Sequence, residues 1–284
     1  MPKLLPFTKM HGAGNDYVYV SAFEQEVENP GELARRISDR HFGVGSDGLV
    51  LILPSSVADV RMRMFNADGS EAEMCGNASR CVAKYAYDHG LVSSEHISLE
   101  TGAGIKHIDL RLQGGEVVGA TVDMGCPELE PGKIPVLPVE AGQKDFINRE
   151  LTVNGTRRRI TAVSMGNPHA VLFLPEIDSL DLAKIGPHFE THAQFPKKTN
   201  TEFVQVLSPS AVKMRVWERG AGETLACGTG ACATAVACVL NHLTDRTVDV
   251  RLLGGTLRIE WRKDDGHVLM SGNAVTVFDG VYRY

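Results

Sequence analysis

The sequence predicts a mixed α/β fold that occurs twice along one chain. Shifting the sequence against itself by 152 residues aligns VRMRMFN (Val60–Asn66) with VKMRVWE (Val212–Glu218), and the same shift aligns Cys75 with Cys227. Apolar and basic residues alternate in both runs, as they do in half-buried strands. Each cysteine is followed by glycine and then by a stretch that reads as a helix. A single ungapped register with these matches predicts an internal duplication.

The first copy opens with a turn, because Asn15 follows a glycine and precedes an apolar run. The segment 30–40 has apolar residues at helical spacing, and its proline suits a first helical turn. A Gly-rich loop carries Cys75, and a helix is expected to begin there and to stop near Gly90. We expect helices at 30–40 and 81–89 and strands at 17–22, 49–53, 60–65, 97–99, 104–112 and 117–123.

The second copy repeats this order after a turn at Asn167. We expect helices at 180–191 and 231–242 and strands at 170–174, 201–206, 212–217, 248–252, 256–261 and 267–271. The segment 127–148 is rich in Pro, Gly and charge, which predicts a linker. The predicted domains are therefore 1–122, with 275–284 returning to it, and 123–274.

Composition excludes several classes of protein. The 284 residues are 43% hydrophobic and 23% charged, with a net charge of −6. Without a basic block, neither a nucleic acid nor a membrane surface is an expected partner. No apolar run approaches the ~18 residues of a membrane span, and no signal segment is evident, so we expect a cytoplasmic protein. Six cysteines in that compartment predict thiols, and the absence of C-x-x-C argues against a metal site.

Two cysteines at two helix starts suggest a specific chemistry. A helix N-terminus presents unpaired N–H groups and a partial positive charge, so it binds anions and favours a thiolate. The duplication can place Cys75 and Cys227 on opposite sides of one substrate atom. One thiolate would then remove a proton from a carbon while the opposing thiol supplies a proton to the other face. Such a reaction is a racemisation or epimerisation, and helix N-termini could stabilise its carbanion without a cofactor.

Several runs resemble the diaminopimelate epimerase family over nearly the whole chain, in order. ERGAGETLACGTGAC, ending at Cys232, is the most specific of them. The others are MHGAGNDY, FNADGSE, CGNASRC, MGNPHAV and NTEFVQV. The resemblance implies cofactor-independent interconversion of LL- and meso-diaminopimelate, in the synthesis of lysine and of peptidoglycan precursors. It also implies two similar domains, each a barrel-like sheet around a central helix, with the active site in the cleft between them. A homodimer is expected as well.

The resemblance assigns roles to individual residues. Cys75 and Cys227 become the base and acid pair, while His169 and Glu218 would lie near the substrate amino group and the thiols. The groups expected at the α-carboxylate are Gly76, Asn77, Gly228 and Thr229. Those expected at the distal amino-acid end are Asn66, Asn200 and Arg219, with Asn15 and Asn167 beside them.

Two positions depart from the family pattern. Ala78 stands where glycine is usual, and we expect this change to be tolerated because the backbone N–H survives. Gly48 stands where some members have a glutamine that contacts substrate, so that contact is absent here.

Three other interpretations of the sequence remain. A racemase of another amino acid, of the proline or histidine type, could use the same paired cysteines but would not need Asn66, Asn200 and Arg219. A redox-responsive binding protein could switch by joining the two thiols, and it would exchange no α-hydrogen. GTGACA also fits G-x-G-x-x-A, but the preceding strand is expected to end about ten residues too early for dinucleotide binding.

Overall fold

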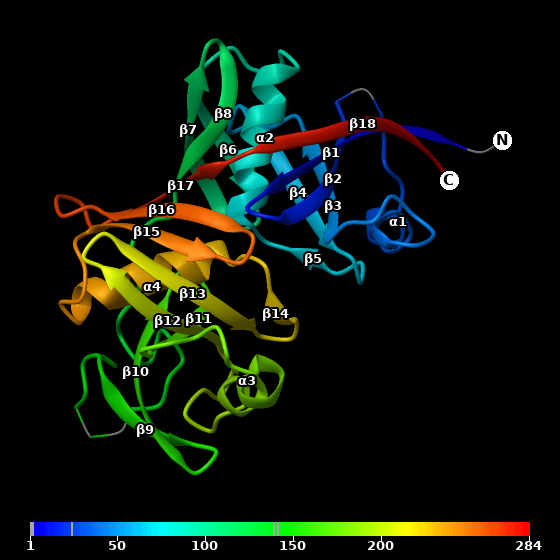
Figure 1. Ribbon diagram of the computed structural model, residues 1–284. Helices are drawn as coiled ribbons and strands as arrows, with labels where there is room; N and C mark the ends of the chain where they lie inside the picture. The colour runs from blue at the N-terminus through cyan, green and yellow to red at the C-terminus, as the bar shows by residue number, and fades with distance from the viewer. Residues whose placement is uncertain (1–2, 24, 139, 141) are drawn as a thin grey trace. The chain divides into compact units, whose positions relative to one another are not determined.

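The residues that the computed structural model describes (3–23, 25–138, 140 and 142–284) form two units. Unit 1 comprises the chain up to Asp123 together with Ser271–Tyr284, and unit 2 comprises Met124–Met270. The boundaries predicted from the sequence, 122/123 and 274/275, separate the two sequence repeats and not the two compact units. They remain a prediction. Figure 1 labels the elements of both units.

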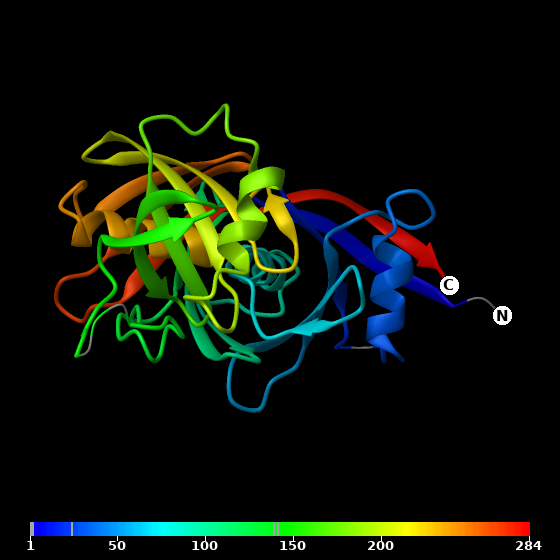
Figure 2. The same ribbon diagram turned by 90° about the horizontal axis from the view of Figure 1, so that it is seen from below.

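Unit 1 surrounds one helix with strands. Its sheet follows the order β18, β1, β2, β3, β4, β6, β7 and β8, with the short β5 on β4. Helix α2 packs against β1, β2, β4, β6, β7 and β8, and Figure 2 views it nearly end-on. The elements are β1 (Leu4–Gly12), β2 (Asn15–Ser21), α1 (Pro30–Ser38), β3 (Gly48–Leu53), β4 (Val60–Asn66), β5 (Glu71–Ala72), α2 (Gly76–Asp88), β6 (His96–Thr101), β7 (Gly104–Gln113), β8 (Glu116–Asp123) and β18 (Val275–Arg283).

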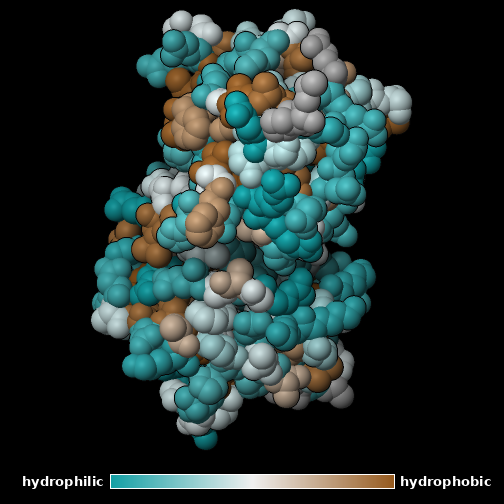
Figure 3. All heavy atoms as spheres, turned by 90° about the vertical axis from the view of Figure 1, so that its right-hand side faces the viewer, coloured by the Kyte–Doolittle hydropathy of each residue, from teal (hydrophilic) through white to brown (hydrophobic). Residues whose placement is uncertain are grey.

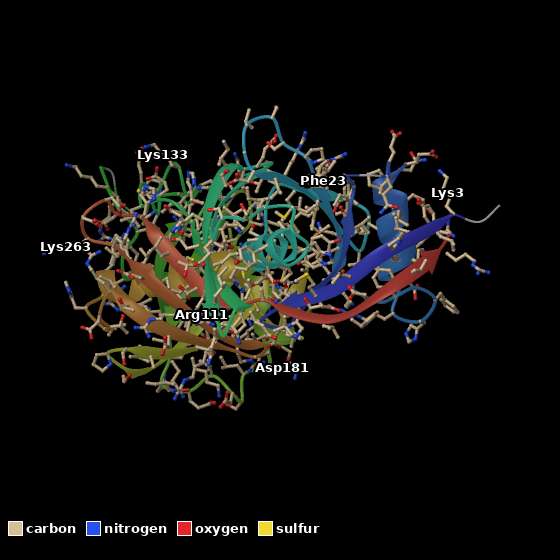
Figure 4. The ribbon with its side chains drawn as sticks, turned by 90° about the horizontal axis from the view of Figure 1, so that it is seen from above. Lys3, Phe23, Arg111, Lys133, Asp181 and Lys263 are labelled. Atoms are coloured by element: carbon tan, nitrogen blue, oxygen red, sulfur yellow. The ribbon has the colours of Figure 1, made fainter. Side chains whose placement is uncertain are left out.

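The last strand belongs to unit 1. β18 pairs antiparallel with β1 from Leu4↔Arg283 to His11↔Val275. Figure 4 shows the start of β1, near the labelled Lys3, beside the end of β18. Arg111 on β7, also labelled there, donates to the side-chain oxygen of Asn273 (3.0 Å). Residues from the two ends of the chain therefore complete one unit.

Unit 2 has the same plan. Its sheet follows the order β9, β10, β11, β12, β13, β15 and β16, with β14 on β13. Helix α4 packs against β10, β11, β12, β15 and β16. The elements are β9 (Arg149–Val153), β10 (Thr156–Ser164), β11 (Pro168–Phe173), α3 (Leu182–Glu190), β12 (Asn200–Ser208), β13 (Ala211–Glu218), β14 (Gly222–Thr224), α4 (Gly228–Leu240), β15 (Thr247–Leu252) and β16 (Gly255–Trp261). β17 (Val268–Asn273) crosses the boundary between the units.

Strand register confirms the duplication. The parallel pair β2–β3 places Tyr17 opposite Gly48, and the parallel pair β11–β12 places His169 opposite Asn200, each 152 residues further on. Matching ion pairs join Arg63 to Glu71 (2.7 Å) and Arg215 to Glu223 (2.8 Å). The predicted mixed α/β fold with two similar, barrel-like domains is confirmed.

The two central helices begin earlier than predicted. The sequence analysis placed their starts at Cys81 and Ala231, where the apolar residues begin, whereas α2 starts at Gly76 and α4 at Gly228. The cysteine before each helix has extended backbone angles and acts as the N-cap, so small residues can form the first turn inside the sheet. Consecutive residues of α4 from Gly230 to Cys238 are buried, as expected of a helix enclosed by strands.

The predicted linker is part of the core of unit 2. Ile134, Val136 and Phe146 are buried and pack with Leu151 and Phe203. Two positions of this segment, 139 and 141, lie outside the described residues. The sequence analysis also gave no strand at β9 or β10, because the three consecutive arginines from Arg157 hide the apolar residues that follow them.

Helix length and surface character agree with the composition. Among the described residues, no helix combines the length and apolar character that crossing a bilayer requires. Figure 3 presents one face of the molecule, on which hydrophobic residues form small groups among hydrophilic ones.

Gly48 provides a test of packing in unit 1. A Cβ atom at this position would overlap the carbonyl oxygen of Phe65 and lie 2.8 Å from Cε1 of Tyr17. Because backbone atoms form the obstacle, β3 and β4 would have to separate. We expect Gly48→Ala to lower the free energy of unfolding by about 1–3 kcal/mol, measured by urea denaturation. Gly132→Ala, at an open and exposed position, is the control, with an expected change within about 0.5 kcal/mol. Equal stability of the two variants would contradict the packing argument.

Candidate active site

Each unit has a central helix that begins directly after a cysteine. Cys75 precedes α2 with φ −138° and ψ 123°, and Cys227 precedes α4 with φ −122° and ψ 111°. The first N–H groups of each helix have no helical partner and carry its positive dipole end. Both cysteines carry thiol groups that form no disulfide. They occupy the same place in the two copies.

Asn15 connects the first cysteine to its surroundings. The Cys75 thiol donates to Oδ1 of Asn15 (3.3 Å), and Nδ2 of Asn77 donates to the same oxygen (3.4 Å). The Asn15 amide nitrogen in turn donates to Oδ2 of Asp47 (2.8 Å). Three residues predicted for the site therefore meet at one amide oxygen in unit 1, and Asp47 fixes the direction of that amide.

Arg80 supports the first turn of α2 from within the core. Its guanidinium is fully buried and donates to Oδ1 of Asn77 (2.7 Å), to the Gly76 carbonyl (3.3 Å) and to the Asn273 carbonyl (3.3 Å). These bonds direct the NH₂ group of the Asn77 amide toward Asn15.

A charged network surrounds Asn15. Asp16 forms ion pairs with the buried Lys9 (2.5 Å) and with Arg40 (2.9 Å), and Arg40 also pairs with Asp47 (3.0 Å). Burial disfavours the ionised Asp16 carboxyl, but hydrogen bonds from Arg40 and Lys9 outweigh burial and lower its pKa. The network holds the turn between β1 and β2.

Asn66 lies apart from these bonds. It ends β4, and its side-chain nitrogen donates to Oγ of Ser70 (3.0 Å). Its backbone N–H donates to the Ser70 carbonyl. These contacts of Asn66 are those of a turn residue.

The second cysteine caps its own helix. Sγ of Cys227 accepts from the N–H of Gly230 (3.4 Å) and lies 3.6 Å from the hydroxyl oxygen of Thr229. Space around it is tight, since a Cβ at Gly228 would lie 3.0 Å from Sδ of Met270. Gly228 and Thr229 are partly exposed, whereas the helix is buried from Gly230 to Cys238.

His169 is held at both ring nitrogens. Nδ1 lies 2.7 Å from Oε1 of Glu202, and Nε2 lies 2.9 Å from Oδ1 of Asn167. The side chains of His169 and Glu202 are both fully buried. Two predicted site residues, Asn167 and His169, are therefore in direct contact.

Glu218 ends β13 and lies near the Cys227 thiol. Burial raises the pKa of this carboxyl, while hydrogen bonds from Thr224 and from the Cys227 thiol partly oppose the change. The Thr224 hydroxyl donates to Oε1 of Glu218.

The Cys227 thiol is also held in its protonated form. Burial raises the pKa of Cys227 well above its usual range, and the nearby carboxyls of Glu218 and Glu202 raise it further. The sequence analysis predicted that a helix N-terminus would make this thiol lose its proton more easily. For Cys227 that prediction was wrong, because burial and two acidic neighbours raise the pKa of the thiol by more than the hydrogen bonds from Thr229 and Gly230 lower it.

The Asn200 side chain contacts the backbone of Arg219. The Asn200 amide donates to the Pro168 carbonyl (3.0 Å) and accepts from the Arg219 N–H (2.8 Å). Nη1 of the exposed Arg219 donates to the Lys197 carbonyl (3.0 Å). Asn200 thus orders the turn that carries Arg219.

No group of three or more His, Cys, Asp or Glu residues within the described part of the chain is arranged to hold a metal ion.

Comparison with known proteins identifies the family. The family model described as diaminopimelate epimerase matches residues 7–130 and 161–277. A diaminopimelate epimerase of Desulfovibrio desulfuricans is 63% identical, over 99% of both chains. One of Methanococcus maripaludis is 56% identical over 97% of this chain and 99% of the relative, and one of Acetivibrio thermocellus is 56% identical over 96% and 97%.

The chain belongs to the diaminopimelate epimerase family. Solved structures with low identity share its fold. A probable proline racemase from Agrobacterium radiobacter has a TM-score of 0.71 at 13% identity, covering 97% of this chain and 92% of that one. A hydroxyproline epimerase from Agrobacterium vitis has a TM-score of 0.67 at 13% identity, covering 99% and 92%.

Three residues of the site escaped the sequence analysis: Asp47, Arg80 and Glu202. Two of them carried a usable signal. Arg80 is a charge inside a helix that is otherwise buried, and Glu202 is a charge inside an apolar strand. Such charges rarely occur in a core without a partner. Asp47 lies in a loop, where a carboxylate carries no such signal.

The free energy of unfolding of this protein should depend on pH through the Glu218 carboxyl. Because its pKa is raised in the folded state, the folded protein holds this proton at higher pH than the unfolded chain does. Its stabilising contribution is full below the ordinary value of 4.5 and is lost as pH rises through the folded value. We expect wild type to lose stability relative to Glu218→Gln from about pH 4.5 upward, by about 1.4 kcal/mol for each unit of pKa shift.

Urea unfolding at a series of pH values measures this difference. Glu260→Gln, an exposed change of carboxylate to amide in the same unit, is the control for loss of a charge. A difference between wild type and Glu218→Gln that stays constant with pH would show that the carboxyl is not perturbed by burial.

Proposed function

We propose that this protein is an isomerase that converts LL-2,6-diaminopimelate to meso-diaminopimelate without a cofactor, by a two-base mechanism. The observation that carries the proposal is the matched pair of cysteines, each at the start of the central helix of its own copy. Relatives at 54–63% identity named diaminopimelate epimerase support the substrate.

The reaction moves two protons. A thiolate takes the α-hydrogen as a proton, and the bonding electron pair stays on the α-carbon. The opposing thiol then gives its proton to the other face of that carbon. Thiol and thiolate have exchanged roles at the end, so the same pair also runs the reverse reaction. The proposal requires the N-terminal ends of α2 and α4 to reach one α-carbon.

The starting protonation state follows from the surroundings of the second cysteine. A pKa raised by burial and by Glu218 keeps Cys227 as a thiol in the free protein. We therefore assign Cys227 as the initial proton donor and Cys75 as the initial base, which must first lose the hydrogen that its thiol donates to Asn15.

The negative charge that develops on the substrate needs fixed donors. Unpaired N–H groups at the starts of α2 and α4 suit an α-carboxylate whose charge grows as the carbanion forms. Gly76, Asn77, Gly228 and Thr229 belong to these first turns. A single oriented donor of this kind contributes about 3 kcal/mol. His169 and Glu218 are proposed beside the substrate amino group.

The distal end of the substrate is a second amino-acid head group. We assign it to Asn66 and to Arg219, which can pair bidentately with a carboxylate. Asn200 would act mainly through the turn that presents Arg219, since its amide is already bonded at both ends. Asn15 and Asn167 complete the set through their contacts with Cys75 and His169.

The product would serve lysine and peptidoglycan precursor synthesis in the cytoplasm. We also propose a homodimer. Support comes from exposed apolar side chains on the adjoining strands β1 and β18, which are Leu4, Val277, Phe278 and Val281.

Exchange of the α-hydrogen tests the two-base mechanism. Reduced protein is incubated with LL-diaminopimelate in D₂O without added cofactor, and NMR follows deuterium incorporation and formation of the meso product. We expect Cys75→Ala and Cys227→Ala each to lower the epimerisation rate by about 10²–10⁴-fold. Cys126→Ala, at an exposed cysteine outside both helix starts, is the control and should keep the wild-type rate. Wild-type epimerisation in either helix-start variant would rule out the paired mechanism.

Substrate choice is tested separately. A protein with a site for a second head group should turn over LL-diaminopimelate and leave L-proline and L-histidine unchanged, because neither has a group for Arg219 to bind. Polarimetry with each amino acid, at equal enzyme concentration, measures the difference. Faster turnover of L-proline or L-histidine would mean that the scaffold serves another racemase. No turnover of any of the three, or of a wider panel of amino acids, would favour a redox-switched binding protein.

A further inference from the structure

One carboxylate of unit 2 has no counterpart in unit 1. Glu202 lies in the middle of β12, is fully buried and is flanked by the buried residues Thr201 and Phe203. Burying a carboxylate is costly unless it is paired and hydrogen-bonded. Its presence in a core strand therefore needs an explanation.

The first copy indicates that the fold itself does not require this carboxylate. The residue 152 positions earlier is Val50, which is also fully buried, in β3. The two positions have the same place in the sheet, since Tyr19 is opposite Val50 and Val171 is opposite Glu202 in parallel strand pairs. A valine thus satisfies the same packing position. The reason for the glutamate must lie in what it contacts.

Glu202 contacts His169 with one oxygen. Oε1 lies 2.7 Å from Nδ1 of His169, and Oε2 has no hydrogen-bond partner among the described residues. A Cβ atom at Gly230 would lie 2.7 Å from Oε1 of Glu202 and 3.2 Å from Sγ of Cys227. The carboxylate therefore reaches the first turn of α4, and the missing side chain of Gly230 leaves room for it.

The protonation of the ring follows from these partners. A neutral imidazole has one donor and one acceptor nitrogen, and an ionised carboxylate only accepts. Nδ1 must therefore carry hydrogen to bond to Glu202. Nε2 faces Oδ1 of Asn167, an oxygen that also only accepts, so this contact needs a hydrogen on Nε2 as well or an Asn167 amide turned to present its NH₂ group. Without Glu202 either nitrogen could carry the hydrogen, and the ring could turn.

We propose that Glu202 is a positioning residue that holds His169 with Nδ1 protonated and Nε2 directed toward Asn167. This role rests on the proposed function, because it acts on a residue placed at the substrate amino group. The other titratable groups near this pair are Glu218 on β13 and Cys227 before α4, and the Glu202 charge acts on both.

Nitrogen NMR tests the contact without any need for activity. Protein labelled with ¹⁵N-histidine gives separate ring signals for nitrogens with and without hydrogen, and His169→Gln identifies the His169 signals. We expect Nδ1 of His169 to carry hydrogen in wild type and to lose that fixed state in Glu202→Gln and in Glu202→Val. Glu190→Gln, which changes another buried carboxylate of unit 2, should leave the His169 signals unchanged. An Nδ1 without hydrogen in wild type would overturn the proposal.

Kinetics separate positioning from a merely structural role. Glu202→Gln should lower kcat by about 10–100-fold, as loss of an orienting partner does, with a smaller change in KM. Glu202→Val places at this position the residue that the first copy has at Val50. The variant should therefore fold with a Tm at or above that of wild type. Its kcat should still fall below that of wild type. A Glu202→Val protein that folds and keeps wild-type kcat would overturn the proposal. If wild type fails to epimerise diaminopimelate, the proposed function falls, whereas the nitrogen spectra still decide the Glu202–His169 contact.

Discussion

A helix enclosed by a sheet can present only its ends to other molecules, and the rest of this structure depends on that constraint. In α4, the chain is buried from Gly230 to Cys238, and the partly exposed parts are the first residues, Gly228 and Thr229, and the last, Val239 and Leu240. The central position makes small residues necessary along the helix and gives it a dry environment. Its N–H groups are consequently strong donors, since a low dielectric strengthens electrostatic interactions. A cysteine at the N-cap then lies at the end of the helix that carries these N–H groups.

The two copies share this geometry but place different side chains around the cysteine. Around Cys75 the partners are amides, with Asn15 and Asn77 aligned by Asp47 and Arg80. Around Cys227 the partners are acidic, with Glu218 and Glu202 close enough to keep the thiol protonated. The two copies therefore share a backbone plan but differ in the side chains that surround their cysteines.

The fold was predictable from the sequence wherever a pattern repeated or alternated. The duplication and most strands follow from VRMRMFN, VKMRVWE and the two Cys-Gly pairs. The starts of α2 and α4 were missed, because Gly76 and Gly228 read as loop residues while the capping cysteine decides the boundary. The segment around Ile134 and Phe146 was mistaken for a linker, because scattered apolar residues have no period and burial comes from tertiary packing. Within the site, Glu202 was missed although a charge in an apolar strand is a signal, because its partner His169 lies 33 residues away in the sequence.

The return of the last strand has a consequence for how the protein is made. β18 pairs with β1 along nearly its whole length, so unit 1 contains both the first and the last described parts of the chain. Unit 2, in contrast, is one continuous segment. During synthesis from the N-terminus, unit 2 can complete its contacts while unit 1 still lacks β18. The two units are thus completed in the reverse of the order in which their synthesis begins. The sheet of unit 1 begins to emerge first and is finished last. The edge of β1 that pairs with β18 stays unpaired until residues 275–283 leave the ribosome.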